Sequence, residues 1–292
     1  MKVLVTGAAG SIGRVVTAGL AARGHLVTGL DLVPRPDDAD LAGSTVHWPT
    51  VHLPTVDWLS VDCTDADAVA AAFDGRAFDG RAFDAVVHLA GHPGEAGLPD
   101  SLSSHLITTA ALLDAMVEHR VSRFVYASSN HAVGRTPRRD RVGVDARPRP
   151  DTFYGVAKVA AEAVMSLYAD RYGIDAVACR IGSFRERPAT MRHLSTWLSH
   201  GDCVRMVEAA LTAPAPGFAV LYGISANTRA WWDLEPGRAL GYEPLDDAEE
   251  FAGSIRSDPD DDLDAAHVGG MFATAEFERP ALDRVRAVGD GQ

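Results

Sequence analysis

The chain has 292 residues, of which 47% are hydrophobic and 23% charged, a balance typical of a folded globular protein rather than a disordered or fibrous one. Its formal net charge of −13 argues against a nucleic-acid partner, because affinity for a phosphate backbone comes from clustered Lys and Arg. Cys63, Cys179 and Cys203 are too far apart to form a disulfide framework or a metal motif, so we expect no bound metal and a reducing compartment. The apolar runs are too short for a signal peptide or a bilayer-spanning helix, which predicts a cytoplasmic protein with no membrane partner.

Apolar runs bounded by turn residues alternate with stretches of helical spacing along the first two thirds of the chain. The elements predicted in this way are strands at 3–6, 26–31, 57–61, 85–90, 123–128 and 174–181 and helices at 11–23, 65–73, 101–119 and 152–172. Such alternation predicts an α/β fold with a parallel sheet covered by helices on both faces.

Two short internal repeats interrupt this alternation, at 46–55 and 73–82. They are too short to stack into a solenoid, so we interpret them as duplicated surface loops. Later in the chain the regular alternation stops, with one further strand predicted at 218–222. We therefore expect residues 1–182 to form a nucleotide-binding core that carries the catalytic residues, and 183–292 to form mainly a small C-terminal substrate-binding lobe within the same compact unit.

A glycine-rich turn, Thr6-Gly7-Ala8-Ala9-Gly10-Ser11-Ile12-Gly13, follows the first predicted strand. Its three glycines let the backbone turn tightly, approach a pyrophosphate and pack the following helix on the sheet. The start of that helix then offers free amides and the positive end of its dipole to the anion. Because the turn stands between a strand, a helix and a second strand, it predicts a dinucleotide site in a Rossmann-like, doubly wound sheet rather than glycines used only for packing.

Two carboxylates are placed to contact the cofactor. Asp31 ends the second predicted strand, 18 residues after Gly13, where it would accept hydrogen bonds from the adenosine ribose and repel a 2′-phosphate, which favours NAD. Arg35 lies close enough to keep NADP as an alternative. Asp62 follows the third predicted strand, where it either bonds the adenine amino group or caps the helix that begins near Asp65.

Tyr154 and Lys158 form the candidate proton-transfer pair, because residues four apart share one face of a helix. A tyrosine with its ordinary pKa of about 10 is a poor base at neutral pH, and we expect the nearby Lys158 cation to favour the phenolate and lower that pKa. Ser129 ends the fifth strand, where its hydroxyl can donate to a substrate oxygen, while Ser128 is interpreted as structural.

The glycine turn, the strand-end serine and Tyr-x-x-x-Lys, in this order, resemble the extended short-chain dehydrogenase/reductase family over nearly the whole chain. The resemblance implies that the Tyr154 phenolate takes the hydroxyl proton of an alcohol, that Ser129 polarises the oxygen, and that Lys158 binds the nicotinamide ribose while hydride passes to NAD. It also implies a homo-oligomer. The implied cofactor contacts are Gly7, Gly10, Ser11, Ile12, Gly13, Asp31, Asp62, Cys63, Leu89, Ala90, Gly91, Tyr154 and Lys158.

Further stretches resemble the uronate dehydrogenases within that family: Ser128-Ser129-Asn130-His131-Ala132-Val133-Gly134, Arg180-Ile181-Gly182-Ser183, Leu194-Ser195-Thr196-Trp197-Leu198-Ser199-His200, Ser225-Ala226-Asn227 and Trp231-Trp232-Asp233. This implies NAD-dependent oxidation of C1 of a hexuronic acid, such as glucuronate or galacturonate, to an aldarolactone. An acidic sugar in an acidic protein needs a specific cation, and Arg192 would clamp its carboxylate, unless it is a surface arginine beside His193. The implied substrate contacts are Ser129, Asn130, His131, Ser183 and Arg192.

Two positions depart from those enzymes. Pro93 stands where they carry a small hydroxyl residue that contacts the sugar, and His105 stands where many members of the wider family have asparagine. The departures concern the identity of the sugar more than the reaction. His92, Glu95 and His105 are candidates for new polar contacts in the pocket wall, and for the two histidines the alternative is an ordinary loop or helix residue.

Two other functions are compatible with these motifs. A sugar or sugar-nucleotide epimerase or reductase shares the cofactor site and the Tyr-Lys pair, although a dehydratase would call for an acidic residue where this chain has Asn130. A cofactor-sensing scaffold without chemistry is disfavoured because Ser129, Tyr154 and Lys158 are all present.

Overall fold

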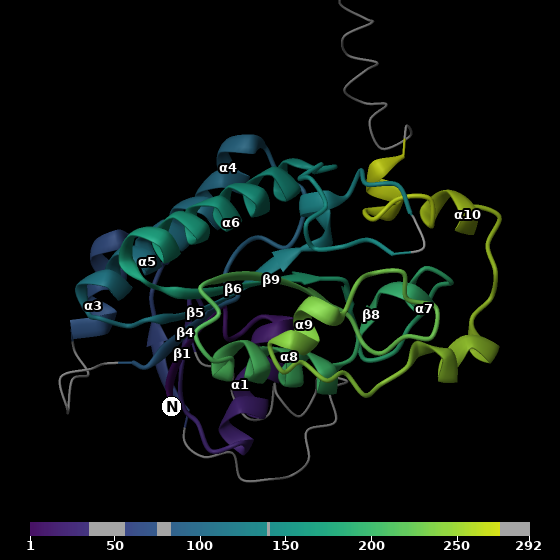
Figure 1. Ribbon diagram of the computed structural model, residues 1–292. Coiled ribbons are helices and arrows are strands. Elements are labelled where there is room, and N and C mark those ends of the chain that lie inside the picture. The colour runs from purple at the N-terminus through teal and green to yellow at the C-terminus, as the bar shows by residue number, and fades with distance from the viewer. Residues whose placement is uncertain (35–55, 75–82, 139–140, 275–292) are drawn as a thin grey trace, which may run out of the picture.

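The computed structural model describes residues 1–34, 56–74, 83–138 and 141–274 (Figure 1). The repeat at 46–55 therefore lies outside the described residues, as does most of the repeat at 73–82. Arg35, the residue that kept NADP as an alternative, lies outside them as well.

Seven strands form one parallel sheet in the order β3-β2-β1-β4-β5-β6-β9. Their bounds are β1 (Lys2–Thr6), β2 (Leu26–Asp31), β3 (Asp57–Ser60), β4 (Ala85–His88), β5 (Arg123–Ser129), β6 (Asp175–Ile181) and β9 (Phe218–Gly223). Strands β1, β2 and β3 follow one another toward one edge of the sheet, and β4, β5, β6 and β9 follow one another toward the opposite edge. The direction in which strands are added therefore reverses between the neighbours β1 and β4. In sheets of this kind ligands bind beyond the carboxyl ends of the strands at such a reversal. The predicted Rossmann-like α/β fold is confirmed.

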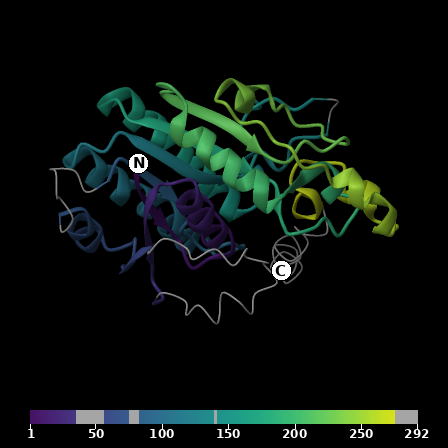
Figure 2. The ribbon, with the colours of Figure 1, turned by 90° about the horizontal axis from the view of Figure 1, so that it is seen from below.

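Helices cover both faces of the sheet. On one face lie α3 (Ala66–Asp74), α5 (Thr108–Glu118) and α6 (Phe153–Tyr172) (Figure 1). On the other lie α1 (Ser11–Ala22) and α8 (His200–Thr212), which the view from below shows side by side (Figure 2). Because side chains alternate along a strand, each face has its own apolar core: Val3 and Val5 of β1 join one core, and Leu4 joins the other.

The remaining elements are short. They are α4 (Leu98–Leu102), the π-helical turn η1 (Ser103–Ile107), the 3-10 turns η2 (Asn130–Val133), η3 (Ala248–Ser254) and η4 (Gly270–Ala273), the strands β7 (Ser183–Phe184) and β8 (Trp197–Leu198), and the helices α7 (His193–Thr196), α9 (Glu235–Ala239) and α10 (Asp261–Asp264). The helix predicted at 101–119 is thus found as α4, η1 and α5 in succession. A π-helical turn inside a helix is rare and often marks a functional site.

The chain after residue 182 contributes to two parts of the molecule. It supplies α8 and β9 to the sheet and its helical cover. It also supplies residues 264–274, which we call the C-terminal strap and which run alongside 134–138 through main-chain bonds such as Gly269 N to Gly134 O and Val268 N to Thr136 O. None of the helices within the described residues is both long and apolar enough to cross a membrane.

A buried ion pair supports the sheet beneath its carboxyl edge. Nε and Nη2 of Arg180 donate to the two Glu162 carboxylate oxygens at 3.0 and 2.8 Å. The Arg180 and Glu162 side chains are only 5% and 8% exposed. Ser128 also donates to Glu162, at 2.5 Å, which agrees with its structural interpretation.

Removing one partner of this pair should be costly. Arg180→Ala leaves the Glu162 charge buried without its cation, so we expect the free energy of unfolding to fall by about 3–5 kcal/mol. Urea titration followed by circular dichroism measures this change. Arg229→Ala, which breaks the exposed pair with Glu249, is the matched control and should change stability little. Equal losses in the two variants would contradict the assigned role of the Glu162 pair.

Candidate active site

The glycine turn after β1 adopts a shape that side chains would block. Gly7 has φ +68°, and a Cβ placed there would lie 2.6 Å from the main-chain nitrogen of Ala90. A Cβ on Gly13 would lie 2.0 Å from the Gly7 oxygen, so this glycine serves the packing of α1 against the turn. No side chain caps the start of α1 at Gly10, which leaves its first amides available to an anion. The turn therefore fits the pyrophosphate of a dinucleotide.

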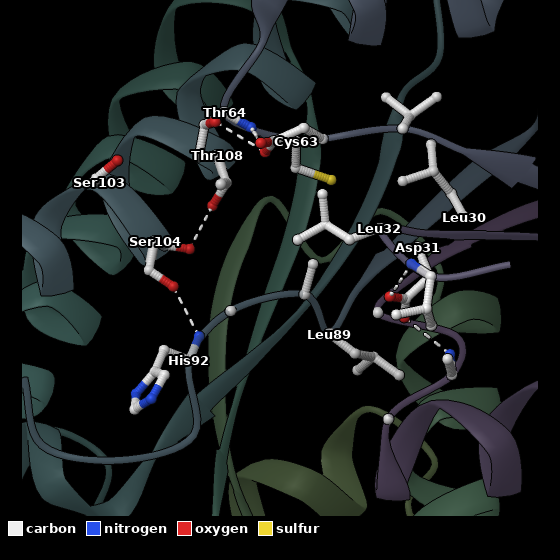
Figure 3. A pocket seen from close by; sticks show the side chains of 18 of the residues that line it. Leu30, Asp31, Leu32, Cys63, Thr64, Leu89, His92, Ser103, Ser104 and Thr108 are labelled. Atoms are coloured by element: carbon white, nitrogen blue, oxygen red, sulfur yellow. Dashed lines mark hydrogen bonds between the residues drawn. The ribbon is translucent and has the colours of Figure 1, made fainter.

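A cleft of about 630 Å³ opens at this edge of the sheet, between the ends of β1, β2, β3 and β4 (Figure 3). The predicted cofactor residues that line it are Gly7, Gly10, Asp31, Asp62, Cys63, Leu89, Ala90 and Gly91. Ser11, Ile12 and Gly13 do not line it, because they belong to the first turn of α1. Sequence reasoning missed Thr64, Ser104 and Thr108, polar lining residues on segments with no motif of their own.

The two predicted carboxylates differ in their local bonds. Asp31 Oδ2 accepts from the Ala9 amide at 2.9 Å, so this side chain holds the glycine turn as well as facing the cleft. Asp62 accepts from the Thr64 amide and hydroxyl at 2.8 Å, and these bonds lower the pKa of the Asp62 carboxyl. The helix cap is instead Asp65, which accepts from Ala68. Asp62 therefore shapes a turn at the cleft wall, and its bond to adenine stays a prediction.

The Cys63 thiol is a neutral part of the cleft wall. Burial, followed by the nearby Asp62 and Asp31 charges, raises the pKa of Cys63 to about 12. The side chain is 5% exposed and packs with the apolar core beneath β3 and α3. It therefore contributes surface to a ligand rather than a reactive thiolate.

The candidate catalytic residues come together where β5 meets α6. Ser129 ends β5, and its hydroxyl accepts from the His131 amide at 3.2 Å. Lys158 donates to the Ala127 carbonyl at 2.7 Å, and its ammonium lies 5.2 Å from the centre of the Tyr154 ring. Ser129 also interacts with Tyr154, because burial raises the pKa of the Tyr154 phenol and a hydrogen bond with Ser129 opposes part of that shift. The structure thus brings the three predicted residues together.

The expected lowering of the Tyr154 pKa by Lys158 does not occur in this structure. Burial raises the pKa of Tyr154 to about 12, more than the Ser129 hydrogen bond lowers it. Burial likewise lowers the pKa of Lys158 to about 7, against the opposing effect of Glu162. Both shifts have the same cause, because burial penalises the charged form of each group. The sequence showed the neighbouring charge but not the desolvation.

Three groups fix the start of α6 and hence the position of Tyr154. The Thr152 hydroxyl accepts from the Gly155 amide at 2.9 Å as the helix cap. Glu95, from the loop after β4, accepts from the amides of Phe153 and Tyr154 at 3.1 and 3.3 Å. Gly155 allows η2 to approach closely, since a Cβ there would lie 2.4 Å from the His131 oxygen. Glu95 therefore has a structural contact with α6, and a contact between Glu95 and the sugar stays a prediction.

His131 is oriented by a buried carboxylate. Its Nδ1 lies 2.9 Å from Asp151, whose side chain has no exposed surface. Because a carboxylate accepts and does not donate, Nδ1 carries the hydrogen and Nε2 is left for a ligand. The imidazole also packs edge-on against the rings of Tyr154 and Phe272, at centroid distances of 5.9 and 5.0 Å. The sequence identified His131 but not Asp151.

His105 is an uncharged side chain that packs against Tyr154 in the candidate site. It is 2% exposed and packs edge-on against Tyr154 at a centroid distance of 5.0 Å. Its Nε2 lies 3.0 Å from the His92 carbonyl, which can only accept, so Nε2 carries the hydrogen. Burial and then Lys158 lower the pKa of His105 to about 3, so the ring is uncharged at neutral pH. His105 thus adds no second cation beside Lys158.

Arg192 lies inside the molecule, which contradicts the alternative of a surface arginine. Its side chain is 12% exposed, and burial lowers its pKa. Its guanidinium donates to main-chain carbonyls of the C-terminal strap, including Val268, which also accepts from Asn130 at 3.0 Å. Ser183 bonds the Thr196 hydroxyl at 2.9 Å, and Thr196 in turn donates to the Arg192 carbonyl. Hydrogen bonds through Val268 and Thr196 therefore link Asn130, Ser183 and Arg192.

The chain matches a known protein family. The family model described as NAD dependent epimerase/dehydratase family matches residues 3–216. The chain is a member of that family. Uronate dehydrogenase from Pseudomonas putida is 37% identical over 194 residues, which are 65% of this chain and 72% of that enzyme. NAD-dependent glucose-6-phosphate dehydrogenase from Haloferax volcanii is 37% identical over 184 residues, 57% of this chain and 70% of that relative.

A solved structure gives the same result over a longer span. The crystal structure of a mutant uronate dehydrogenase from Agrobacterium tumefaciens, complexed with NAD, has a TM-score of 0.80 and 36% identity, and the match covers 93% of this chain and 96% of that one. Membership in the NAD-dependent epimerase/dehydratase family confirms the resemblance identified from the glycine turn and the Tyr-Lys pair, and it confirms NAD as the cofactor of the family. The uncapped start of α1 and the cradle around Gly7 fit this cofactor.

The role of Asp31 in choosing between NAD and NADP is directly testable. Asp31→Asn keeps an acceptor for the Ala9 amide but removes the charge that would repel a 2′-phosphate. We expect the ratio of kcat/KM with NADP to that with NAD to rise by about tenfold or more. Initial rates with each cofactor measure this ratio. Asp62→Asn removes the same charge elsewhere on the cleft wall and should affect both cofactors alike; an equal change of the ratio in both variants would contradict the assignment.

Proposed function

We propose that the protein catalyses NAD-dependent oxidation of C1 of a hexuronic acid, such as glucuronate or galacturonate, to an aldarolactone. The observation that carries the proposal is Arg192, a buried cation on the same wall as Asn130 and His131 in a chain of net charge −13. A buried guanidinium is suited to an anionic ligand, because its planar fork matches a carboxylate. The uronate dehydrogenases described above supply the class of sugar.

The reaction needs one proton acceptor and one hydride acceptor. The C1 hydroxyl of the cyclic uronate loses its proton to the Tyr154 oxygen, while Ser129 donates a hydrogen bond to the same substrate oxygen. The C1–H bond breaks with its electron pair, and C1 becomes the carbonyl carbon of the lactone. Bound NAD supplies the hydride acceptor and a positive nicotinamide ring. Lys158, held by the Ala127 carbonyl, binds the nicotinamide ribose.

The surroundings of Tyr154 support this assignment. His105 and His131 pack edge-on on its ring, so the phenol is held in one orientation before substrate arrives. Burial holds the pKa of Tyr154 at about 12 even with Lys158 beside its ring, so the positive charge that bound NAD would supply favours loss of the proton.

A substrate panel tests the proposed function. NADH formation is followed at 340 nm with glucuronate, galacturonate, their uncharged parent sugars and glucose 6-phosphate, the last because the Haloferax volcanii relative is named for it. We expect uronates to be oxidised with NAD at a kcat/KM at least about a hundredfold above the uncharged sugars, since loss of a buried charge partner costs several kcal/mol. If glucose 6-phosphate were the preferred substrate, the proposed uronate substrate would be wrong and a sugar phosphate would take its place. Turnover of none, with NAD retained through purification, would favour the epimerase alternative.

Tyr154→Phe tests the base. The variant keeps the ring that packs on His105 and loses the group that takes the proton, so kcat should fall by about a hundredfold or more while NADH still binds. In the parent enzyme, kcat/KM should rise with pH, because burial raises the pKa of Tyr154 and the phenolate is the reactive form. Steady-state rates from pH 6 to 10 and NADH fluorescence titration measure both. A variant with near-parental kcat, or with the same pH dependence, would refute the role of Tyr154.

A further inference from the structure

The C-terminal strap, residues 264–274, lies directly on the wall that holds the predicted substrate residues. Phe272 packs on the His131 ring at a centroid distance of 5.0 Å. Gly269 lies over the buried Asp151, so closely that a Cβ on this glycine would fall 1.6 Å from the carboxylate. The strap is therefore in contact with His131 and Asp151, which it follows by more than a hundred residues in the sequence.

Main-chain carbonyls of the strap bind the Arg192 guanidinium on one side. Nη1 donates to the oxygens of Asp264 and His267 at 3.0 and 3.3 Å, and Nη2 donates to the Val268 oxygen. A guanidinium has five N–H groups, so the bonds to described residues leave the Nε–H and at least one Nη2–H, which lie on nitrogens joined to the same carbon. Two adjacent N–H groups are the arrangement that binds a carboxylate with two parallel bonds.

The charge of Arg192 is not cancelled by these bonds. All three acceptors are neutral carbonyls, and the nearest carboxylate oxygen, that of Asp264, is 4.0 Å from Nε. Asp264 is itself engaged, because its Oδ1 accepts from the Met271 amide at 2.8 Å. Burial lowers the pKa of Arg192, and the Asp264 and Asp151 charges oppose this shift only in part. A bound anion would complete this environment.

We propose that the C-terminal strap is the positioning element for the substrate carboxylate: its carbonyls at 264, 267 and 268 hold Arg192 so that Nε–H and Nη2–H face the acid group. The Val268 oxygen binds the Asn130 amide as well, so one carbonyl aligns two substrate residues. The inference rests on the proposed function, since it assigns a purpose to the strap only if the substrate is an acid. It adds that specificity for the acid depends on the strap as much as on Arg192.

A substitution at Gly270 tests the contact between the strap and Arg192. It has φ +65°, and a Cβ there would lie 2.8 Å from Cζ and Nε of Arg192. Gly270→Ala should displace the guanidinium and raise KM for the uronate by about tenfold or more, with kcat and KM for NAD nearly unchanged. Gly217→Ala is the matched control, because Gly217 has φ +60° with nothing within 4 Å of a Cβ, so it adds the same backbone strain away from the site. Thermal unfolding of both variants separates strain from positioning.

A double-mutant cycle shows whether the effect passes through Arg192. Arg192→Ala should raise KM for the uronate on its own, and Gly270→Ala should then add almost nothing. A second pair avoids the strained glycine: Asp264→Asn and Asp264→Ala both remove the charge, but only Asn keeps an acceptor for the Met271 amide. We expect KM for the uronate to be higher in Asp264→Ala than in Asp264→Asn.

The outcomes separate the two proposals. If the parent enzyme shows no preference for uronates over uncharged sugars, the proposed function fails and this inference fails with it. If the parent prefers uronates, but Gly270→Ala behaves like Gly217→Ala and the two Asp264 variants have equal KM, the proposed function stands and the positioning role of the strap is overturned. Additive effects of Gly270→Ala and Arg192→Ala would also overturn it, because the strap would then act independently of the arginine.

Discussion

The candidate site depends on the burial of the Lys158 ammonium beside the Tyr154 phenol. A buried ammonium is stable only with nearby acceptors, and Lys158 has the Ala127 carbonyl at 2.7 Å, the face of the Tyr126 ring and, one helical turn away, the Glu162 charge. Glu162 is held in turn by Arg180. The Glu162–Arg180 pair thus stabilises the fold, and its Glu162 charge also favours the ammonium form of Lys158. Removing the Glu162 charge would affect both.

Close main-chain contacts shape both the cofactor cleft and the start of the helix that carries this buried pair. At Gly7 the turn after β1 touches the end of β4, and at Gly155 the start of α6 touches η2, in each case at a distance that excludes any Cβ. The carboxyl ends of neighbouring parallel strands already share one edge of the sheet. The glycines let helix starts approach that edge closely, so their amides and side chains face a common space. Geometry of the backbone, more than any one side chain, therefore sets the position of Tyr154.

How much of this was predictable depends on the range of each interaction. The strands, the glycine turn and the Tyr-x-x-x-Lys spacing follow from local periodicity, so the fold and the residues Ser129, Tyr154 and Lys158 were found from sequence. Glu95 was not assigned to cap α6, since 58 residues separate it from the first amide that it binds. The partners of Arg192 are main-chain carbonyls, which leave no residue signature. The raised pKa of Tyr154 results from desolvation, which a sequence pattern does not encode.

Under the proposed function, the neutral partners of Arg192 explain how a strongly acidic chain would bind an acid. At physiological salt, exposed charges more than about 8 Å apart are largely screened. The net charge of −13 therefore has little effect on an anion inside the pocket, and the groups near the anion determine its affinity. If carboxylates held Arg192, they would orient it and neutralise it together. Carbonyl dipoles orient the guanidinium without neutralising it, and Asp264, 4.0 Å from Nε, is the carboxylate that pairs with it within the described residues. His105 is neutral for a different reason, because burial and then the Lys158 charge lower its pKa to about 3.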